Sequence, residues 1–229
     1  MALLKAALFD WDGTLFDSLR NTNFYNVVKK LGWTSDRKIE GSIEKPEYFG
    51  KSAQHIISDL FPGVTQEEID LFHKVWNELD HENIGLLPGT LEILENLRLN
   101  EVKTGIISQR NGASLQKLVT KHNLRKFFSY DLIQGKDTWA YSKPDYRVFN
   151  WILYLLKEVG IKNPADKIIY IGDSLDDLYC TRQASIEFFG LETGPIQKER
   201  WIKEGLDADH IHEDLKSLNG WLVSRKYLN

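Results

Sequence analysis

Four short runs of Leu, Ile, Val and Phe constrain the fold more than any other feature of this sequence. Each has the length of a β-strand and little alternation of apolar and polar residues, which is typical of strands covered on both faces. Between them, apolar residues recur every three or four positions, as in amphipathic helices. These patterns predict an α/β fold, a doubly wound parallel sheet flanked by helices. The apolar runs are residues 3–9, 102–107, 168–171 and 186–189. The helical stripes include Leu91, Leu94 and Leu97, then Leu115 and Leu118, then Val148, Ile152, Leu155 and Val159.

One long stretch interrupts this alternation. Residues 17–86 contain helical patterns and no convincing strand. We therefore predict a helical domain inserted into a core made of residues 1–16 and 87–229, with two short connections that act as a hinge. Thr65 and Glu68 have the spacing of a capping box at a helix start. The apolar stripes of the insert are Phe24, Val27, Val28 and Leu31, and Ile69, Phe72, Val75, Trp76 and Leu79.

Charge and cysteine content exclude several classes of partner. The chain has 33 acidic and 29 basic residues, a net charge of −4 and a pI of about 5.9, which offers no broad cationic surface to a nucleic acid. The longest apolar run, residues 151–156, is far shorter than the ~20 residues that span a bilayer. Cys180 is the single cysteine, which favours a reducing compartment. We expect a cytoplasmic protein without a membrane or nucleic-acid partner.

Two carboxylates follow the first apolar run. Asp10 and Asp12 stand where the predicted strand gives way to a loop, and Gly13 allows a tight turn there. The carboxyl edge of a parallel sheet is the usual ligand site of such folds. Taken alone, this pair fits a solvated acidic turn as well as a functional site.

A second acidic segment follows another apolar run, 168–171. It contains Asp173, Ser174, Asp176 and Asp177. If the two strands are neighbours, at least three carboxylates converge, and two carboxylates ~4 Å apart repel by ~4 kcal/mol at an effective dielectric constant of 20. A cation must offset this repulsion, and oxygen ligands without a His/Cys cluster indicate Mg²⁺ rather than Zn²⁺. By itself, the segment also fits a helix cap.

Two further residues have the chemistry to bind a phosphate. Ser108 ends the strand run 102–107, where its hydroxyl and the following N–H groups can hold a phosphate oxygen. Lys143 precedes Pro144, which we place at the first position of a helix. A loop serine or a surface lysine is the ordinary interpretation of each, so both depend on the acidic segments for their significance.

The four motifs together resemble those of the haloacid dehalogenase-like hydrolase superfamily, in its phosphatase branch with a helical cap. They occur in the family's order: LFDWDGT, the serine after GII, Lys143 with Pro144, and GDSLDD after IIYI. The resemblance spans essentially the whole chain, and its C-terminal part is similar to phosphoglycolate phosphatases, with Ser185 where those often have Gly. It implies a Rossmann-like core with a cap at 17–86, and an enzyme that hydrolyses a small phosphomonoester metabolite.

The resemblance also implies roles for individual residues. Asp10 would be the nucleophile that forms an aspartyl-phosphate, and Asp12 the general acid and base. The Mg²⁺ ligands would be the Asp10 carboxylate, the Asp12 backbone carbonyl and the Asp173 carboxylate, with Asp177 or Asp176 behind them. The phosphoryl oxygens would be bound by Thr14, Ser108 and Lys143. Substrate selection would fall to basic residues of the insert, with Arg20, Lys45, Lys51 and His55 as candidates.

Two alternative functions remain open. The β-phosphoglucomutase branch shares the DxD motif and the helical cap, but its early cap histidine would fall at Thr22, which cannot replace the proton chemistry of an imidazole. A non-enzymatic phosphoacceptor or phosphate-binding module also combines clustered Asp residues with Mg²⁺, but such receivers are about half this length and have no cap. We therefore favour the hydrolase.

Overall fold

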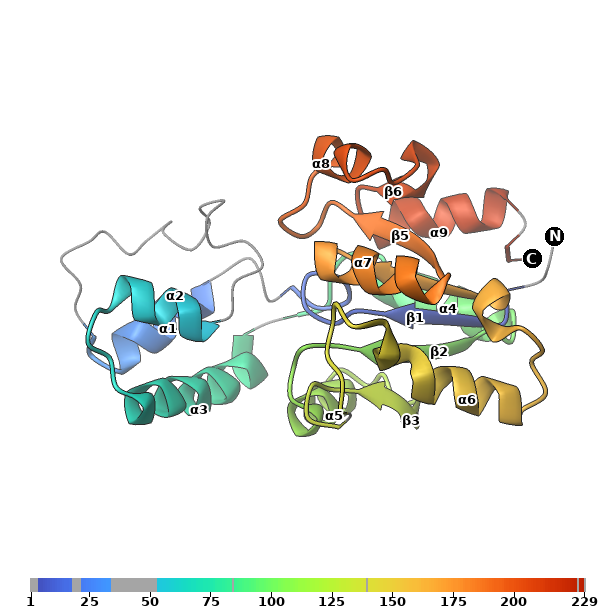
Figure 1. Ribbon diagram of the computed structural model, residues 1–229. Helices are drawn as coiled ribbons and strands as arrows, with labels where there is room; N and C mark the ends of the chain where they lie inside the picture. Colours follow the sequence, from blue (N-terminus) through green and yellow to red (C-terminus); the bar gives the residue numbers. More distant parts are fainter. Residues whose placement is uncertain are drawn as a thin grey trace. The chain divides into compact units, whose positions relative to one another are not determined.

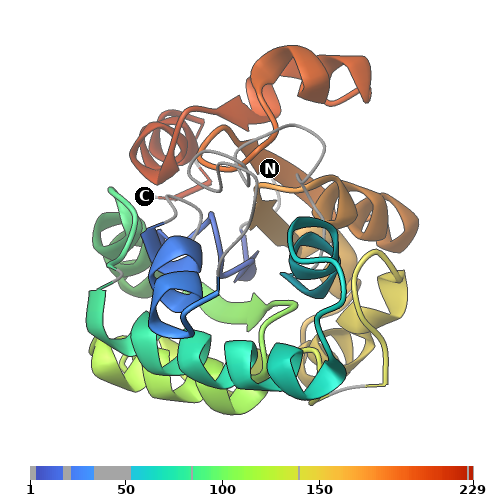
Figure 2. The ribbon, with the colours of Figure 1, turned by 90° about the vertical axis from the view of Figure 1, so that its left-hand side faces the viewer.

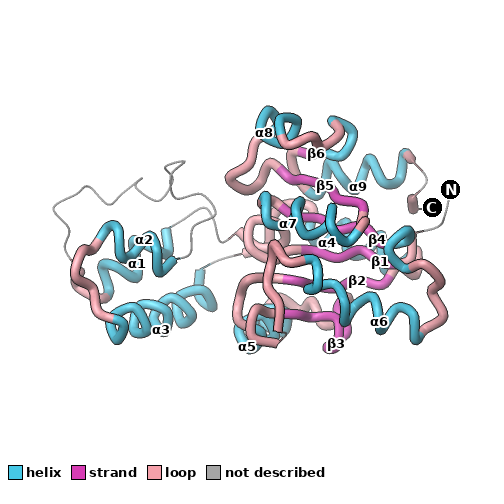
Figure 3. The backbone as a smooth tube through the Cα atoms, in the orientation of Figure 1, coloured by secondary structure: helices cyan, strands magenta, loops and turns pink. Residues whose placement is uncertain are grey.

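The chain folds into an α/β unit and a helical unit (Figures 1 and 3). The α/β unit comprises Met1–Asp17 and Gly85–Asn229, and the helical unit comprises Ser18–Ile84. In this computed structural model the described residues are 4–17, 22–33, 53–83, 85–138, 140–225 and 227–228. Within these ranges, strands occur only in the α/β unit (Figure 3).

A six-stranded parallel sheet forms the centre of the α/β unit, which confirms the predicted fold class. The strand order is β3-β2-β1-β4-β5-β6. In β1, Phe9 pairs with Ile106 of β2 and with Ile171 of β4, so the three strands end at nearly the same level. The loops that follow them therefore start at one edge of the sheet. The strands are β1 (Ala6–Phe9), β2 (Lys103–Ile107), β3 (Phe128–Gln134), β4 (Ile168–Gly172), β5 (Glu187–Leu191) and β6 (Ile211–His212).

Helices cover both faces of this sheet (Figures 1 and 2). One face carries α4 (Thr90–Leu99), α5 (Gly112–Lys121) and α9 (Leu215–Ser224), and the other carries α6 (Asn150–Glu158) and α7 (Leu175–Ala184). Leu8, Tyr170 and Phe188 of the sheet belong to the buried core under α6 and α7. The remaining short helices are η2 (Tyr146–Phe149), η3 (Pro164–Lys167), α8 (Lys198–Lys203) and η4 (Ala208–His210).

Two details of the predicted helices are wrong. Leu91 and Val159, both expected on apolar stripes, are 54% and 59% exposed. In α4 the buried residues are Thr90, Ile93, Leu94 and Leu97. Steps of three residues drift by about 60° around a helix with each step, so Leu91 lies about 120° from Leu97 and cannot share its face.

The helical unit has its own apolar core, as its stripes predict. Phe24, Val27 and Phe72 are buried in one cluster, and Trp33 packs against the ring of Phe72. The Thr65 hydroxyl accepts a hydrogen bond from the Glu68 N–H at 3.3 Å, while the Glu68 carboxylate accepts one from the Thr65 N–H at 2.8 Å. This confirms the capping box. The helices are α1 (Thr22–Lys30), α2 (Ala53–Leu60) and α3 (Gln66–Asn83).

The two chain segments that flank the insert are hydrogen-bonded to each other. The Asp17 N–H donates to the Gly85 carbonyl at 3.0 Å, and the Leu87 N–H donates to the Leu15 carbonyl at 2.9 Å. Both pairs lie within the α/β unit. The chain therefore leaves and re-enters this unit through a short two-stranded connection.

Candidate active site

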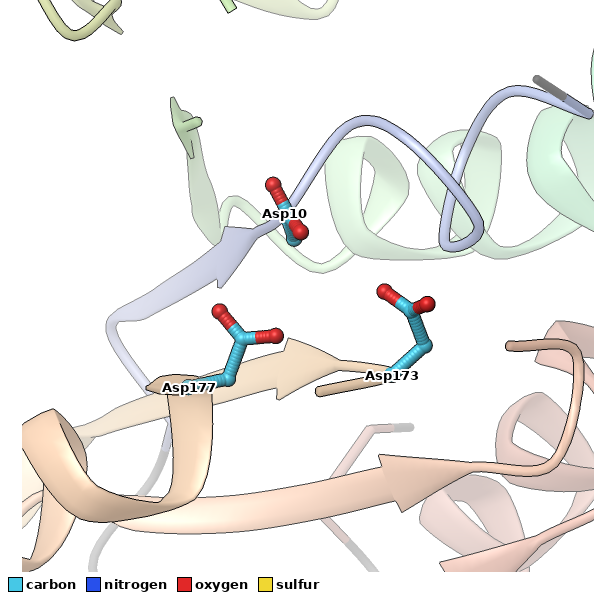
Figure 4. A group of neighbouring side chains, drawn as sticks. All are labelled: Asp10, Asp173 and Asp177. Atoms are coloured by element: carbon cyan, nitrogen blue, oxygen red, sulfur yellow. The ribbon is translucent and has the colours of Figure 1, made fainter. Parts of the chain in front are cut away.

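Three buried carboxylates meet at the carboxyl edge of the sheet (Figure 4). Asp10 follows β1, Asp173 follows β4, and Asp177 lies in the first turn of α7. Each offers a carboxylate oxygen within 4.8 Å of the others, and the residues are only 7%, 3% and 0% exposed. The adjacency of β1 and β4 is what brings these distant stretches of sequence together.

The Lys143 side chain enters the same cluster. Its Nζ lies 3.0 Å from Oδ1 of Asp10 and 2.7 Å from Oδ1 of Asp177, and the side chain is 2% exposed. The expectation that Pro144 occupies the first position of a helix is wrong. Asp145 caps η2, which begins at Tyr146, because its carboxylate accepts the N–H of Arg147. Pro144 therefore precedes the cap, after a cis peptide bond.

Burial dominates the electrostatics of the cluster. It raises the pKa of Asp10 from 3.8 to about 7, although the charge of Lys143 counteracts part of this rise. Burial also raises the pKa of Asp173 well above its usual value, and the charges of Asp10 and Asp177 add to the effect. For Lys143, burial would lower the pKa, but the two carboxylates reverse this and raise it. Among the described residues, one lysine faces three buried carboxylates, so its charge does not outweigh the effect of burial on the pKa of Asp10 and of Asp173.

Both oxygens of Asp177 are already engaged by this chain. Oδ1 accepts from Lys143 and from the Tyr170 hydroxyl, at 2.7 and 3.1 Å. Oδ2 accepts from the N–H and the hydroxyl of Ser174, at 3.1 and 2.6 Å. Ser174 and Asp177 form a capping box at the start of α7. The helix-cap interpretation of this segment is therefore correct, and Asp177 also contacts Lys143, while its functional role stays a prediction.

The donor set fits a divalent metal ion. Asp10 and Asp173 supply carboxylate oxygens, the ligands that hard cations prefer, and the group contains no His or Cys ligand. Among the described residues, three carboxylates lie against one lysine, which leaves two excess negative charges in a buried site when all three are ionised. A divalent ion would balance that excess, whereas leaving it unbalanced in a region of low dielectric is costly.

Thr14 contacts this cluster directly, whereas Ser108 follows the neighbouring strand, β2. The Thr14 hydroxyl is fully buried and donates to Oδ1 of Asp173 at 3.1 Å. Ser108 is 6% exposed, and its hydroxyl accepts the N–H of Arg110 at 3.1 Å. Its own N–H donates to the Gln134 carbonyl. The Ser108 hydroxyl is therefore held by its own loop, at the end of the strand next to β1.

Asp12 is paired with an arginine that the sequence analysis missed. Arg110 Nε lies 3.1 Å from Oδ2 of Asp12, and Nη2 lies 2.6 Å from Oδ1. The Arg110 side chain is 8% exposed and that of Asp12 is 29% exposed. Arg110 follows Ser108 by two residues, so its place in a loop at the carboxyl edge of the sheet was the available signal.

The sequence analysis also missed three other residues that lie beside the acidic cluster or the loop after β1. Tyr170 in β4 lies between Lys143 and Asp177, and its hydroxyl also contacts the Ile107 carbonyl. After β5, the Thr193 hydroxyl donates to the Gly13 carbonyl at 2.6 Å, and Gly194 lies directly against Asp173. The same rule that marked the loops after β1 and β4 applies to the loop after β5.

The basic residues predicted for substrate selection fall outside the described residues. Arg20, Lys45 and Lys51 are not described, and neither is the side chain of His55, although its backbone belongs to α2. The Thr22 side chain, which bears on the mutase alternative, is likewise outside the described set. The roles of these residues stay predictions.

Comparison with known proteins identifies the family. The family model described as haloacid dehalogenase-like hydrolase matches residues 7–191, which include Asp10, Lys143 and Asp173. The chain belongs to the haloacid dehalogenase-like hydrolases. This confirms the resemblance inferred from the motifs, and with it the prediction of a hydrolytic enzyme.

Several relatives of this chain are named as phosphatases. The chain is 24% identical to a phosphoglycolate phosphatase of Vibrio cholerae over 231 residues, covering 95% of this chain and 96% of the relative. It is 26% identical to phosphoglycolate phosphatase 1 of Pseudomonas aeruginosa over 212 residues, covering 86% and 74%. These relatives, together with the family of the chain, support the prediction of a phosphatase.

Solved structures show the same fold. A protein from Haemophilus somnus assigned as a phosphoglycolate phosphatase superposes with a TM-score of 0.75 at 20% identity, covering 95% of this chain and 97% of that one. A protein from Thermotoga maritima assigned as a β-phosphoglucomutase gives 0.73 at 17% identity, with 96% and 99% covered. At these identities the likeness concerns the fold alone.

Among the described helices, none has the length and hydrophobicity required to cross a bilayer.

Proposed function

We propose that this hydrolase is a Mg²⁺-dependent phosphatase of a small phosphomonoester, with phosphoglycolate as the leading substrate. The observation that carries the proposal is the buried cluster of Asp10, Asp173 and Asp177 around Lys143. Phosphoryl transfer depends mainly on positioning and on charge stabilisation, which such a cluster provides when a divalent ion is bound. The names of the relatives supply the choice of substrate.

Asp10 is the proposed nucleophile. Its Oδ1 accepts hydrogen bonds from Lys143 and from the Trp11 N–H, at 3.0 and 2.7 Å, which fixes the carboxylate at the end of β1. One Asp10 oxygen bonds to phosphorus as the ester P–O bond breaks, giving an aspartyl-phosphate. The leaving oxygen keeps the electron pair of that bond and takes a proton from Asp12.

Water completes the cycle. It gives a proton to Asp12 as its oxygen bonds to phosphorus and the bond to Asp10 breaks, which releases inorganic phosphate and restores the carboxylate. Thr14, Ser108 and Lys143 are proposed to bind the transferring phosphoryl oxygens. Asp177 holds Lys143 in place through its 2.7 Å ion pair.

Mg²⁺ would be held by the carboxylates of Asp10 and Asp173 and by the Asp12 carbonyl. When bound, it would neutralise negative charge on the transferring phosphoryl group. We also propose that the helical unit, Ser18–Ile84, acts as a cap that selects the substrate, with Arg20, Lys51 and His55 as its candidate contacts. A cytoplasmic location remains part of the proposal, consistent with the single, buried Cys180.

A panel of phosphomonoesters tests the proposal. We expect phosphate release from at least one small ester, phosphoglycolate first, with Mg²⁺ and not with EDTA. Asp10→Asn should abolish turnover, whereas the control Asp209→Asn, which changes an exposed carboxylate paired with Arg225, should retain it. A wild-type protein inactive on every ester, or an Asp10→Asn protein with full turnover, would contradict the proposal.

The mutase is the second candidate, because a protein assigned to that activity shares the fold. The same assay separates the two. A mutase would interconvert phosphosugars by moving the phosphoryl group within or between sugars, with little release of inorganic phosphate. Turnover of a phosphosugar without phosphate release would favour the mutase and refute the phosphatase.

A further inference from the structure

Arg110 is paired with Asp12, the proposed general acid. In the proposed reaction Asp12 protonates the leaving oxygen, so whatever touches the Asp12 carboxylate also borders the leaving alcohol. Arg110 approaches both Asp12 oxygens through Nε and Nη2, at 3.1 and 2.6 Å. A guanidinium is a planar fork that matches a carboxylate, and it remains charged at any working pH.

The surrounding loop holds the backbone of Arg110 in place. The Arg110 N–H donates to the Ser108 hydroxyl at 3.1 Å, and the Arg110 carbonyl accepts the Lys136 N–H at 3.0 Å. The guanidinium carbon lies 5.9 Å from the centre of the Phe16 ring. Gly135 permits this packing, since a Cβ there would come within 2.6 Å of the Arg110 carbonyl oxygen. Arg110 is therefore a preorganised cation tied to the proposed phosphoryl-binding serine.

The charges around the site indicate a role for Arg110 beyond orienting Asp12. Among the described residues, the carboxylates of Asp10, Asp12, Asp173 and Asp177 face two cations, Lys143 and Arg110, so two negative charges are left over when all four acids are ionised. Lys143 pairs with Asp10 and Asp177 and is proposed to bind the transferring phosphoryl group. A substrate with a second anionic group on its leaving alcohol would meet Asp12, and Arg110 is the cation placed beside that carboxylate.

We propose that Arg110 is a specificity-determining residue that binds a carboxylate on the leaving alcohol of the substrate. This rests on the proposed function and narrows the substrates to phosphomonoesters that carry a carboxylate on the leaving alcohol. The guanidinium would lie between the substrate carboxylate and Asp12, and it would offset the repulsion that arises once Asp12 has given its proton to the leaving oxygen. A neutral group at that position would gain nothing from Arg110.

A pair of matched substrates tests this inference. Initial rates of phosphate release are measured with the full chain and saturating Mg²⁺, for 2-phosphoglycolate and for its neutral amide, carbamoylmethyl phosphate. We expect the wild-type kcat/KM to favour the acid by about 10- to 100-fold, the range for hydrogen bonds to charged groups. Arg110→Met should remove most of that preference, by lowering kcat/KM for the acid far more than for the amide. Arg110→Lys keeps the charge without the fork and should restore part of it.

The outcomes separate specificity from positioning. Equal losses on both substrates in Arg110→Met would mean that Arg110 only orients Asp12, and would overturn the inference. A wild-type protein that hydrolyses acid and amide equally well would overturn it without any variant, so a misfolded Arg110→Met cannot hide the answer. A wild-type protein inactive on every ester would instead refute the proposed function. Arg98→Met, which removes an exposed arginine paired with Glu95 on α4, is the control and should leave the ratio unchanged.

Discussion

Gly194 sets the position of Asp173, and its replacement by alanine is a sharp test of the site. A Cβ at residue 194 would lie 2.6 Å from both Cβ and Cγ of Asp173, whereas ordinary contact begins at 3.4 Å. Because the Asp173 Cβ itself is in the way, a change of rotamer cannot relieve the overlap. The Asp173 carboxylate or the 192–194 loop must therefore move by about 0.8 Å, and a shift near 1 Å in a catalytic group costs on the order of 100-fold in rate.

Two assays, phosphate release and thermal unfolding, measure the effect of Gly194→Ala. Phosphate release should fall by about 100-fold in kcat/KM. In thermal unfolding, Mg²⁺ at 100 times its Kd should stabilise the wild type by about 2.7 kcal/mol and the variant by clearly less. Gly220→Ala is the matched control: nothing lies within 4 Å of a Cβ there, so it should keep full activity and gain up to about 1 kcal/mol from better helix propensity in α9. Wild-type activity with undiminished Mg²⁺ stabilisation in Gly194→Ala would refute the role given to Asp173.

Three further changes probe other parts of the α/β unit. Lys143→Met leaves Asp10 and Asp177 buried without their cation, so the free energy of unfolding in urea at pH 8 should fall by about 3–5 kcal/mol; a loss below about 1 kcal/mol would contradict the ion-pair argument. Burial lowers the pKa of His212 from 6.5 to about 4, so between these pH values the unfolded chain binds a proton that the folded chain does not. The urea midpoint should therefore decline as pH falls from 6.5 to 4, and less so in His212→Asn; identical profiles would exclude this cause. Ser185 has φ 54° at the end of α7, and Ser185→Gly should raise the melting temperature by relieving about 1 kcal/mol of backbone strain, with no change in kcat/KM.

Apolar runs predicted most of the sheet because buried parallel strands need side chains that are apolar on both faces. β3 (Phe128–Gln134) escaped prediction because its middle residues, Ser129, Tyr130 and Asp131, are exposed, and its pairing with β2 shifts register there. β6 (Ile211–His212) has only two residues, too few to form an apolar run of the kind that marks the longer strands.

The acidic cluster could be anticipated, whereas the residues that tune it could not. Asp10 and Asp173 each follow a recognisable strand, so the carboxyl-edge rule brings them together once the strands are neighbours. Arg110 also follows a strand, but a single polar residue near a strand end is common, and the tertiary fold determines its partner. Tyr170 lies inside β4 and has no such pattern. The pairing of Arg110 with Asp12 joins positions 98 residues apart in the chain, which periodicity cannot reveal.

The strand order has a consequence for how the chain is made. β1 is synthesised first, yet both of its hydrogen-bonding neighbours, β2 and β4, come from residues beyond 102. Ser18–Ile84, with an apolar cluster of its own, leaves the ribosome in between. The helical unit can thus fold while the apolar strand β1 of the α/β unit is still unpaired. The nascent chain should therefore be most prone to aggregation in the interval before β2 emerges.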